Sequence, residues 1–251
     1  MTRVYWRRAS AAQVAVPPGA VASRLVQFGV TMFMTDETMS PVELARAVEE
    51  RGLYSLYVPE HTHIPTSRRT PPPTGDAELR EEYKRTLDPF VAMSMAAAVT
   101  ERLRVGTGIC LVAQRDPIIT AKEVATLDAL SGGRFVFGIG FGWNEDEIED
   151  HGIEMKRRRD VAREHMLAMK ALWRDDIASF DGEFVHLPPS WSWPKPAQAG
   201  GPPVLIGGAA GPKLFAQVAE YADGWIPIGG AGVRAALDDL RRACEERDRD
   251  P

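Results

Sequence analysis

The sequence predicts an α/β protein built around a parallel β-sheet. Six runs with strand character are each followed by a helical pattern, and the connecting turns are short. Most of the strand-like runs are apolar on both faces, which is typical of a parallel sheet covered by helices. The 251 residues suffice for one barrel or for two small domains. Both an open doubly wound sheet and a (β/α)8 barrel fit this alternation, although a closed barrel needs eight units and the chain supplies six.

The first unit begins with a β-rich run over Leu25–Phe33, which predicts a buried strand. The next helix opens with a capping box over Ser40–Glu43 and ends at Gly52. Leu53–Pro59 predicts the second strand, which runs directly into Glu60-His61-Thr62-His63.

The helices of the second and third units share one start signal, an aspartate followed by proline. It opens helices at Asp88 and Asp116, which are expected to run to Val99 and Ser131. The predicted strands are 103–112 and 134–141, and 142–152 is an acidic connection. The remaining pattern predicts a helix over 155–173, a hairpin over 178–187 around Asp181-Gly182, strands at 204–208 and 225–228, and helices over 212–222 and 233–247.

Composition excludes several classes of protein. The chain is 44% hydrophobic and 26% charged, as in soluble globular proteins, and contains no uncharged apolar run long enough to span a membrane. A net charge of −5 argues against a general nucleic-acid binder. The two cysteines, Cys110 and Cys244, are interpreted as buried thiols in a reducing compartment, so we expect a cytoplasmic protein. Residues 1–26 carry arginines but too short an apolar stretch for an export signal, and are predicted to be a disordered tail.

Two glycine-rich turns resemble nucleotide-binding loops without matching them. Gly138–Gly142 lacks the third glycine of the dinucleotide fingerprint and follows the fourth strand. Gly207–Lys213 has Pro212 where a Walker loop needs glycine. Tight turns at strand ends explain both, but a helix follows Gly207-Gly208, so phosphate binding by this turn remains open.

The histidines and carboxylates leave alternatives open. His61 and His63 share one face of an extended segment, but no third ligand is placed by sequence, and no metal site is predicted. A histidine at the carboxyl end of a strand can act as a proton donor or hydrogen-bond partner, or simply pack. The acidic run Asn144–Asp150 suits acid–base catalysis, but a solvated start of a helix explains it better.

Five segments in order resemble the bacterial luciferase-like monooxygenase superfamily, and most closely its branch of coenzyme F420-dependent oxidoreductases. They are FGVTMF (28–33), LYVPEHTHIP (56–65), RVGTGICLV (104–112), RDPIITAKEVATLDALSGGRFVFGIGFGWNEDE (115–147) and PPVLIGGAAGPKLFAQVAEYADGWIPI (202–228). The resemblance implies a TIM barrel with a flavin-like cofactor at the strand carboxyl ends. Its last two strand–helix units would be absent from this chain, which would form one barrel domain over 27–251, with insertions at 64–87 and 178–203 over the pocket.

The resemblance also carries roles over to individual residues. His61 would act at the reaction centre, with Glu60 holding it. The third-strand bulge at Thr107, Gly108 and Ile109 would support the cofactor ring, with a cis peptide between Gly108 and Ile109. The fourth-strand end would contribute Gly140, Gly142 and Asn144, and the phosphate-side turn would contribute Gly207, Gly208 and Ala209.

These matches imply an oxidoreductase that transfers a hydride between coenzyme F420 and a small organic substrate. An FMN-dependent monooxygenase is the alternative within the same fold. A catalytically silent barrel or accessory subunit is the alternative outside it. We also expect strands in sequence order, an open gap between 225–228 and 28–33, and a homodimer in which a partner chain covers exposed surface.

Overall fold

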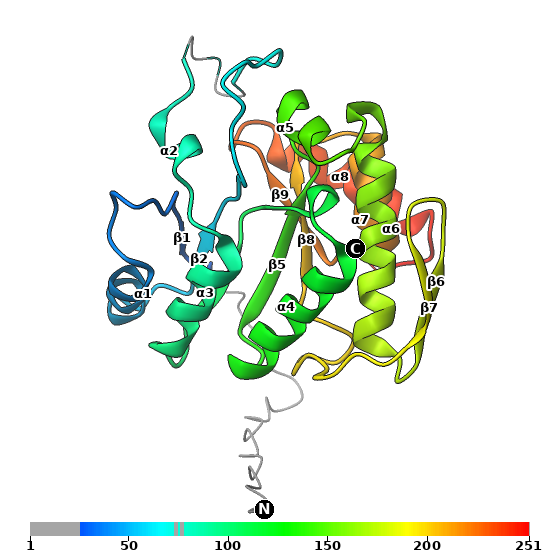
Figure 1. Ribbon diagram of the computed structural model, residues 1–251, viewed down its shortest axis with the longest axis horizontal. Coiled ribbons are helices and arrows are strands. Elements are labelled where there is room, and N and C mark those ends of the chain that lie inside the picture. The colour runs from blue at the N-terminus through cyan, green and yellow to red at the C-terminus, as the bar shows by residue number, and fades with distance from the viewer. Residues whose placement is uncertain (1–25, 73–74, 76–77, 251) are drawn as a thin grey trace, which may run out of the picture.

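The computed structural model describes residues 26–72, 75 and 78–250 and contains one curled parallel sheet (Figure 1). Its strand order is β1-β2-β3-β5-β8-β9, which is sequence order, and β4 also pairs with β5. The strands are β1 (Gly29–Thr31), β2 (Ser55–Val58), β3 (Arg104–Thr107), β4 (Cys110–Leu111), β5 (Phe135–Gly140), β8 (Val204–Gly208) and β9 (Gly224–Pro227). The predicted tail 1–26 lies outside the described residues except for Val26.

Helices cover the outside of this sheet in chain order. They are α1 (Pro41–Glu50), α2 (Glu81–Lys84), α3 (Pro89–Ala98), α4 (Pro117–Leu130), α5 (Glu145–Asp150), α6 (Arg158–Arg174), α7 (Pro212–Tyr221) and α8 (Val233–Glu245), with short 3-10 turns η1 (Val112–Gln114) and η2 (Met155–Arg157). Each large helix contacts the next, from α1 to α3, α4, α6, α7 and α8. A single layer of helices around a curled sheet is the arrangement of a barrel, so the doubly wound alternative is wrong. None of the described helices is long and apolar enough to cross a membrane.

The helix-start signals act as the sequence predicts. Ser40 accepts a hydrogen bond from the Glu43 backbone, and the Glu43 carboxylate accepts one from the Ser40 backbone. Asp88 accepts from Val91 N–H, and Asp116 accepts from the two N–H groups that follow Pro117. These caps satisfy N–H groups that would otherwise lack partners at the start of α1, α3 and α4.

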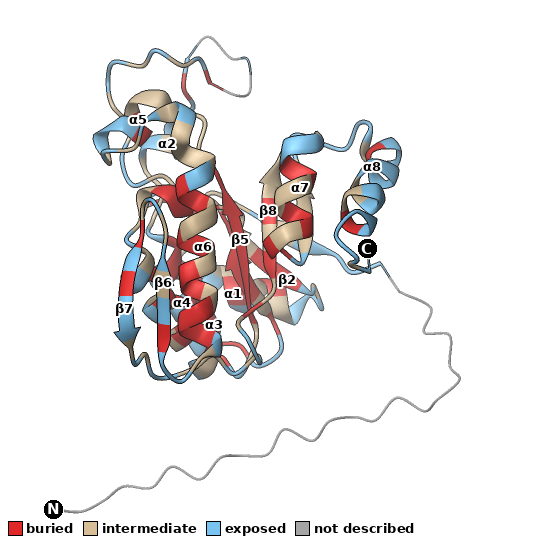
Figure 2. Ribbon diagram, turned by 90° about the vertical axis from the view of Figure 1, so that its right-hand side faces the viewer, coloured by how far each residue is buried: buried red, intermediate tan, exposed pale blue. Residues whose placement is uncertain are grey.

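The core lies between the sheet and the helices α3, α4 and α6. Phe135 and Phe137 from β5 pack with Phe90 from α3 and Trp173 from α6, with ring centroids 6.1–6.3 Å apart. Trp173 also donates its indole N–H to the Ala121 carbonyl of α4, so its one polar atom is satisfied. All residues of β5 are buried, as Figure 2 shows for the central strand.

Three segments differ from the sequence prediction. The single strand expected over 103–112 is broken into β3 and β4, with the predicted cis peptide between Gly108 and Ile109 at the break. The acidic connection 142–152 contains α5, and the loop 64–87 contains α2. Both are helices of six residues or fewer, too short to show an apolar period.

The edges of the sheet and the second insertion follow the prediction more closely. Within the described residues β1 pairs with β2 alone and β9 with β8 alone, so the expected gap is present. The 178–203 insertion contains the hairpin of β6 (Ala178–Asp181) and β7 (His186–Ser190). Its far end is held by the buried Asp128 carboxylate, which accepts the backbone N–H and the side-chain amide of Gln198. Both cysteines are free and buried.

Glu49, near the end of α1, organises the start of the third strand. Its carboxylate accepts backbone N–H groups from Glu101, Arg102 and Leu103, with N···O distances of 3.0, 2.6 and 2.8 Å. Burial pushes the pKa of Glu49 upward, but these N–H groups outweigh burial and lower it. The ionised carboxylate of Glu49 therefore links α1 to the start of β3.

We expect Glu49→Gln to reduce the free energy of unfolding at pH 7 by about 1 kcal/mol, because an amide oxygen accepts more weakly than a carboxylate. A lowered folded-state pKa adds stability above the unfolded pKa, and this stability is lost as pH falls through the folded pKa. Urea unfolding should therefore show a larger difference at pH 7 than at pH 3. Glu50→Gln, at the exposed neighbouring position, should leave stability unchanged at both pH values.

Candidate active site

A cavity of about 460 Å³ opens at the carboxyl ends of the strands, where barrel enzymes place their active sites. Every strand of the curled sheet contributes to it directly or through the residues that follow. Its walls are mainly apolar and aromatic. The lining residues are Thr31, Phe33, Pro59, Glu60, His61, Tyr83, Gly108, Ile109, Leu111, Gly140, Phe141, Gly142, Trp143, Arg158, Arg159, Gly207, Gly208, Ala209, Ile226, Pro227 and Ile228.

The side chain of Ile109 lines this cavity and packs against two neighbouring strands. A Cβ atom added to Gly140 would lie 2.5 Å from the Ile109 side chain, and one added to Gly207 would lie 2.6 Å from it. These two glycines therefore make room for Ile109 on the neighbouring strands. Gly208 makes room for Leu214 in the same way, because a Cβ atom added to Gly208 would lie 2.9 Å from the Leu214 side chain.

His61 is held in the cavity wall by a carboxylate that the sequence did not identify. Its Nδ1 lies 2.8 Å from Oε2 of Glu147, and the two side chains are 6% and 1% exposed. Tyr83 and Trp143 flank the imidazole, with ring centroids at 5.3 and 5.9 Å. Because Nδ1 faces the carboxylate, Nε2 is the ring nitrogen that remains for another partner.

Two expectations about acidic residues are corrected here. Glu60 does not hold His61: its Oε2 accepts the Leu111 N–H at 2.7 Å, and its Oε1 accepts Nε of Arg115 at 2.6 Å. Glu60 is therefore an anchor between the second and third strands. The acidic start of α5 is not uniformly solvated either, because the carboxylate of Glu147 is buried against Nδ1 of His61. The sequence contained one sign of this burial. The apolar residue Ile148 follows Glu147, which indicates that this part of α5 packs against the rest of the protein.

The other carboxylates of α5 bind the segment that follows His61. Arg69 contacts Glu145, Asp146 and Glu149, and its backbone N–H also donates to Asp146 at 2.7 Å. His63 lies 3.0 Å from Asp150. Figure 1 shows α5 and this segment at the same end of the sheet. These contacts hold residues 61–70 against α5, beside the cavity.

The other polar groups of this segment form no metal site. Thr62 contacts both His63 and His151, at 3.1 and 2.8 Å. Burial, and then the charge of His63, lower the pKa of His151. Within the described residues there is no group of three or more histidine, cysteine, aspartate or glutamate side chains arranged to hold a metal ion.

The structure gathers most of the residues that the sequence singled out. Nine of the eleven line the cavity: Glu60, His61, Gly108, Ile109, Gly140, Gly142, Gly207, Gly208 and Ala209. Thr107 and Asn144 lie outside the lining. The Thr107 hydroxyl donates to the Gly138 carbonyl at 2.6 Å, and the buried Asn144 amide has no hydrogen-bond partner among the described residues.

Sequence reasoning missed the aromatic and basic lining. Tyr83 lies in the four-residue helix α2 and Trp143 in the bend before α5, and both segments are too short for a periodicity that would mark an inward residue. Arg158 and Arg159 belong to the run Arg157-Arg158-Arg159 at the start of a long helix, and that run is a visible signal. Cations are unfavourable at the N-terminus of a helix, so arginines in its first turn call for an explanation.

This fold and the position of the cavity define a class of barrel-type α/β enzymes, and sequence comparison names the family. Residues 28–251 match the family described as luciferase-like monooxygenase, so the chain belongs to that family. Members of the family are oxidoreductases.

Two relatives show how far the similarity extends. An uncharacterized protein of Mycobacterium tuberculosis is 49% identical over 203 residues, which are 80% of this chain and 72% of the relative. The phthiodiolone/phenolphthiodiolone dimycocerosates ketoreductase of Mycobacterium kansasii is 29% identical over 208 residues, 80% of this chain and 56% of the ketoreductase.

Solved structures with the same fold include enzymes that use different cofactors. An F420-dependent secondary alcohol dehydrogenase in complex with an F420–acetone adduct has a TM-score of 0.72 at 22% identity, covering 90% of this chain and 68% of the dehydrogenase. The oxygenating constituent of 3,6-diketocamphane monooxygenase of Pseudomonas putida, in complex with FMN, has a TM-score of 0.71 at 16% identity, covering 90% and 64%. At these identities the comparison shows the shared fold and does not distinguish the cofactors.

Proposed function

We propose that the protein is an oxidoreductase that transfers a hydride between coenzyme F420 and a small organic substrate. The observation that carries the proposal is the buried His61–Glu147 pair in the wall of an apolar, aromatic cavity. Hydride transfer to or from a carbon that bears oxygen also moves a proton, and such a pair can bind or release one.

The lining residues fit a deazaflavin. Ile109, Phe141 and Ile226 offer an apolar surface for a planar ring, and Gly140 and Gly207 make room for the Ile109 side chain. Trp143 adds an aromatic edge. When bound, F420 would supply the hydride donor or acceptor at C5 of its central ring.

The protein side chains would orient the substrate and handle the proton. Glu147 holds Nδ1 of His61, so Nε2 can exchange a proton with a substrate oxygen. The fastening of residues 61–70 to α5 by Arg69 would keep this histidine in place and limit entry of water. The two cysteines are buried and free, which suits the reducing cytoplasm where we place the protein.

The comparisons also support a substrate that reacts at a hydroxyl or carbonyl carbon. One similar structure is an F420-dependent secondary alcohol dehydrogenase, and one similar sequence is a ketoreductase, so both relatives are named for chemistry at a hydroxyl or carbonyl carbon. The second candidate function is an FMN-dependent monooxygenase. It is favoured by the FMN-bound structural neighbour, whose fold matches equally well.

Cofactor titration tests the proposal directly. Trp143 lines the cavity, so F420 should quench tryptophan fluorescence, and it should do so at lower concentration than FMN. Trp143→Phe should keep the affinity, measured by calorimetry, while it loses most of the quenching. Tighter binding of FMN would favour the monooxygenase, and binding of neither compound would favour a catalytically silent or accessory barrel.

Replacement of Glu147 tests the role of the histidine pair. Glu147→Gln should leave F420 affinity within about twofold but lower kcat about 10²-fold, because the amide no longer stabilises a protonated His61. The pH dependence of kcat should change as well, which a purely structural defect would not produce. Glu145→Gln lies on the same helix, and its one ion pair among the described residues is with Arg69, so this variant should keep normal kcat and an unchanged pH profile.

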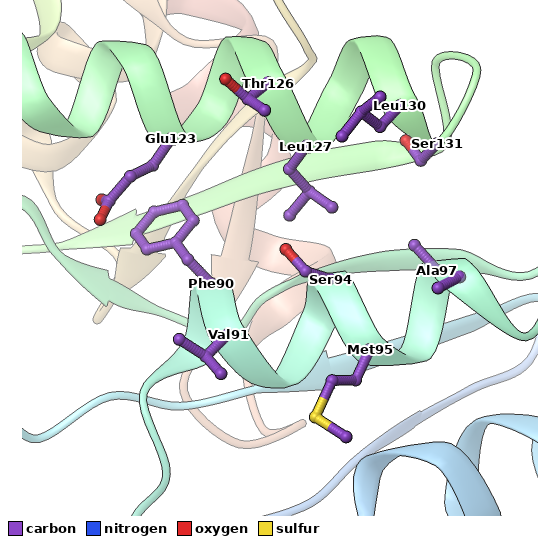
Figure 3. Close-up of a pocket in the computed structure, with 11 residues that line it drawn as sticks. Phe90, Val91, Ser94, Met95, Ala97, Glu123, Thr126, Leu127, Leu130 and Ser131 are labelled. Carbon is purple, nitrogen blue, oxygen red and sulfur yellow. The ribbon is translucent and has the colours of Figure 1, made fainter.

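We further propose that the protein is a homodimer formed through α3 and α4. A groove of about 570 Å³ lies between these two helices, and Figure 3 shows Phe90, Met95 and Leu127 among the residues that line it. Val91 and Leu130, which also line this groove, are 63% and 83% exposed, and Ile119 on α4 is 61% exposed. An apolar surface of this kind on two neighbouring helices is typical of an interface between subunits.

Light scattering after gel filtration should therefore give twice the mass of one 27.6 kDa chain. Leu130→Glu combined with Val91→Glu should yield a monomer, because two charges on each copy would be buried at the interface. Ile177→Glu places a charge at another exposed apolar residue, away from these helices, and should leave the dimer intact. A wild-type monomer would contradict the proposal.

A further inference from the structure

Three aromatic residues, Phe33, Tyr83 and Trp143, form a continuous part of the cavity lining, which we call the aromatic wall. The Tyr83 ring lies between the other two, with its centroid 4.8 Å from that of Phe33 and 6.1 Å from that of Trp143. Each of the three residues is half-buried and lines the cavity. The rings therefore pack against one another and still offer part of their surface to a ligand.

The aromatic wall borders the imidazole that the proposed function uses. Tyr83 and Trp143 both contact the His61 ring, with centroids 5.3 and 5.9 Å away. Glu147 binds Nδ1 of this histidine, so Nε2 is the nitrogen left for a substrate oxygen. When the oxygen of a substrate binds there, a group attached to the same carbon lies next to the aromatic wall.

Contacts outside the cavity hold the aromatic wall in position. Arg85 follows α2 and donates two hydrogen bonds to the Asp36 carboxylate, at 2.8 and 2.6 Å. The Thr86 hydroxyl donates to the backbone carbonyl of His61 at 2.9 Å. The segment that carries Tyr83 is thus tied to the segments that follow β1 and β2. The protein alone forms the wall, and a preformed surface costs less ordering when a ligand binds.

The rest of the cavity lining differs in chemistry. Ile226 and Ile228 come from β9 and the residue after it, and β9 and β1 are opposite ends of the strand order. The two arginines of the lining, Arg158 and Arg159, begin α6, and Arg159 lies over the Phe141 ring at 4.2 Å. The aliphatic side suits the cofactor ring of the proposed function, which leaves the aromatic wall for the substrate.

The composition of the aromatic wall favours one kind of substituent. Its three side chains are uncharged, so a charged group placed against them would lose water without gaining a partner. A planar aromatic group fits them best, because offset and edge-to-face contacts between rings add to the free energy gained from burial of apolar area.

We propose that the substrate is an uncharged aryl-substituted secondary alcohol, or the corresponding aryl ketone, whose aromatic group lies against the aromatic wall; this inference rests on the proposed function. In oxidation the hydroxyl proton passes to Nε2 of His61, and the hydride of the carbinol carbon passes to F420. The C–O single bond becomes a carbonyl, so the alcohol loses two electrons and the cofactor gains them. Reduction of the ketone reverses both transfers.

A complex that cannot react measures substrate binding without turnover. A ketone and oxidised F420 are both in their oxidised forms, so calorimetry of the F420-loaded protein gives the affinity for the ketone. Acetophenone should bind about 5-fold to 10-fold more tightly than cyclohexyl methyl ketone, which has a similar size but no aromatic ring. Equal affinity for the two ketones would overturn the substrate class and leave the proposed function standing.

Substitutions in the aromatic wall assign the preference to its rings. Phe33→Leu and Tyr83→Leu should each remove most of it and leave the affinity for cyclohexyl methyl ketone within about twofold. Tyr83→Phe keeps the ring and should keep the preference. Tyr54→Leu replaces an aromatic residue just before β2, at the end of the strand opposite His61, and should bind both ketones like the wild type. A full preference in both leucine variants would overturn the role of the aromatic wall.

A cofactor-free measurement keeps the two proposals separate. Because the protein alone forms the aromatic wall, acetophenone should raise the melting temperature of the cofactor-free protein more than an equal concentration of cyclohexyl methyl ketone. The double variant Phe33→Leu/Tyr83→Leu should show equal shifts with the two ketones. The same difference in the wild type and the double variant would overturn the role of the aromatic wall. If F420 does not bind, the proposed function fails, and this measurement alone decides whether the wall binds aryl groups.

Discussion

The ends of three strands depend on the position of one side chain, that of Ile109. The third strand breaks after Thr107 and resumes at Cys110, and the side chain of Ile109 lies where Gly140 and Gly207 leave room for it. A larger residue at either glycine would occupy the same space, because its Cβ would come within 2.6 Å of Ile109. The apolar lining of the cavity thus depends on how Ile109, after the end of β3, packs against β5 and β8.

The charged residues around this cavity are divided by function. Glu60 and Arg115 pair with each other and tie the second strand to Leu111 in β4, so they support the cavity. The carboxylates of α5 are paired with Arg69, His61 and His63, and so hold the segment that carries the histidine. Arg158 and Arg159 remain without such partners in the described residues. A cavity in which the negative charge is neutralised and part of the positive charge is not suits an anionic ligand.

The glycine turn shows why a motif has to be interpreted together with its surroundings. Gly207 and Gly208 precede a helix, which in a sequence suggests backbone approach to a phosphate. In the structure both glycines also accommodate neighbouring side chains, Ile109 and Leu214. A substitution such as Gly208→Asp would therefore disturb packing as well as charge.

Much of the fold could be predicted from the sequence because its signals are local. The capping residues Ser40, Asp88 and Asp116 act on N–H groups within three positions, and the apolar runs predict strands whatever their neighbours are. The alternation of strands and helices predicted the order of the strands, and the resemblance to a known family added the break at Gly108 and nine of the residues that line the cavity. Short elements such as α2 and α5 were not predicted, because a helix of six residues or fewer shows no apolar periodicity.

Only the tertiary structure decided which charged side chains pair with each other. Glu60 is adjacent to His61 in the sequence, yet its carboxylate turns to Arg115 and Leu111, while Glu147, 86 residues away, holds the imidazole. Five of the seven residues of Asn144–Asp150 are acidic, and the sequence could not show which of these carboxylates would be buried. Local patterns determine helices, caps and strands because their partners lie a few residues apart. The pairing of side chains depends on which strand ends and helices converge, and that is settled by the curvature of the whole sheet.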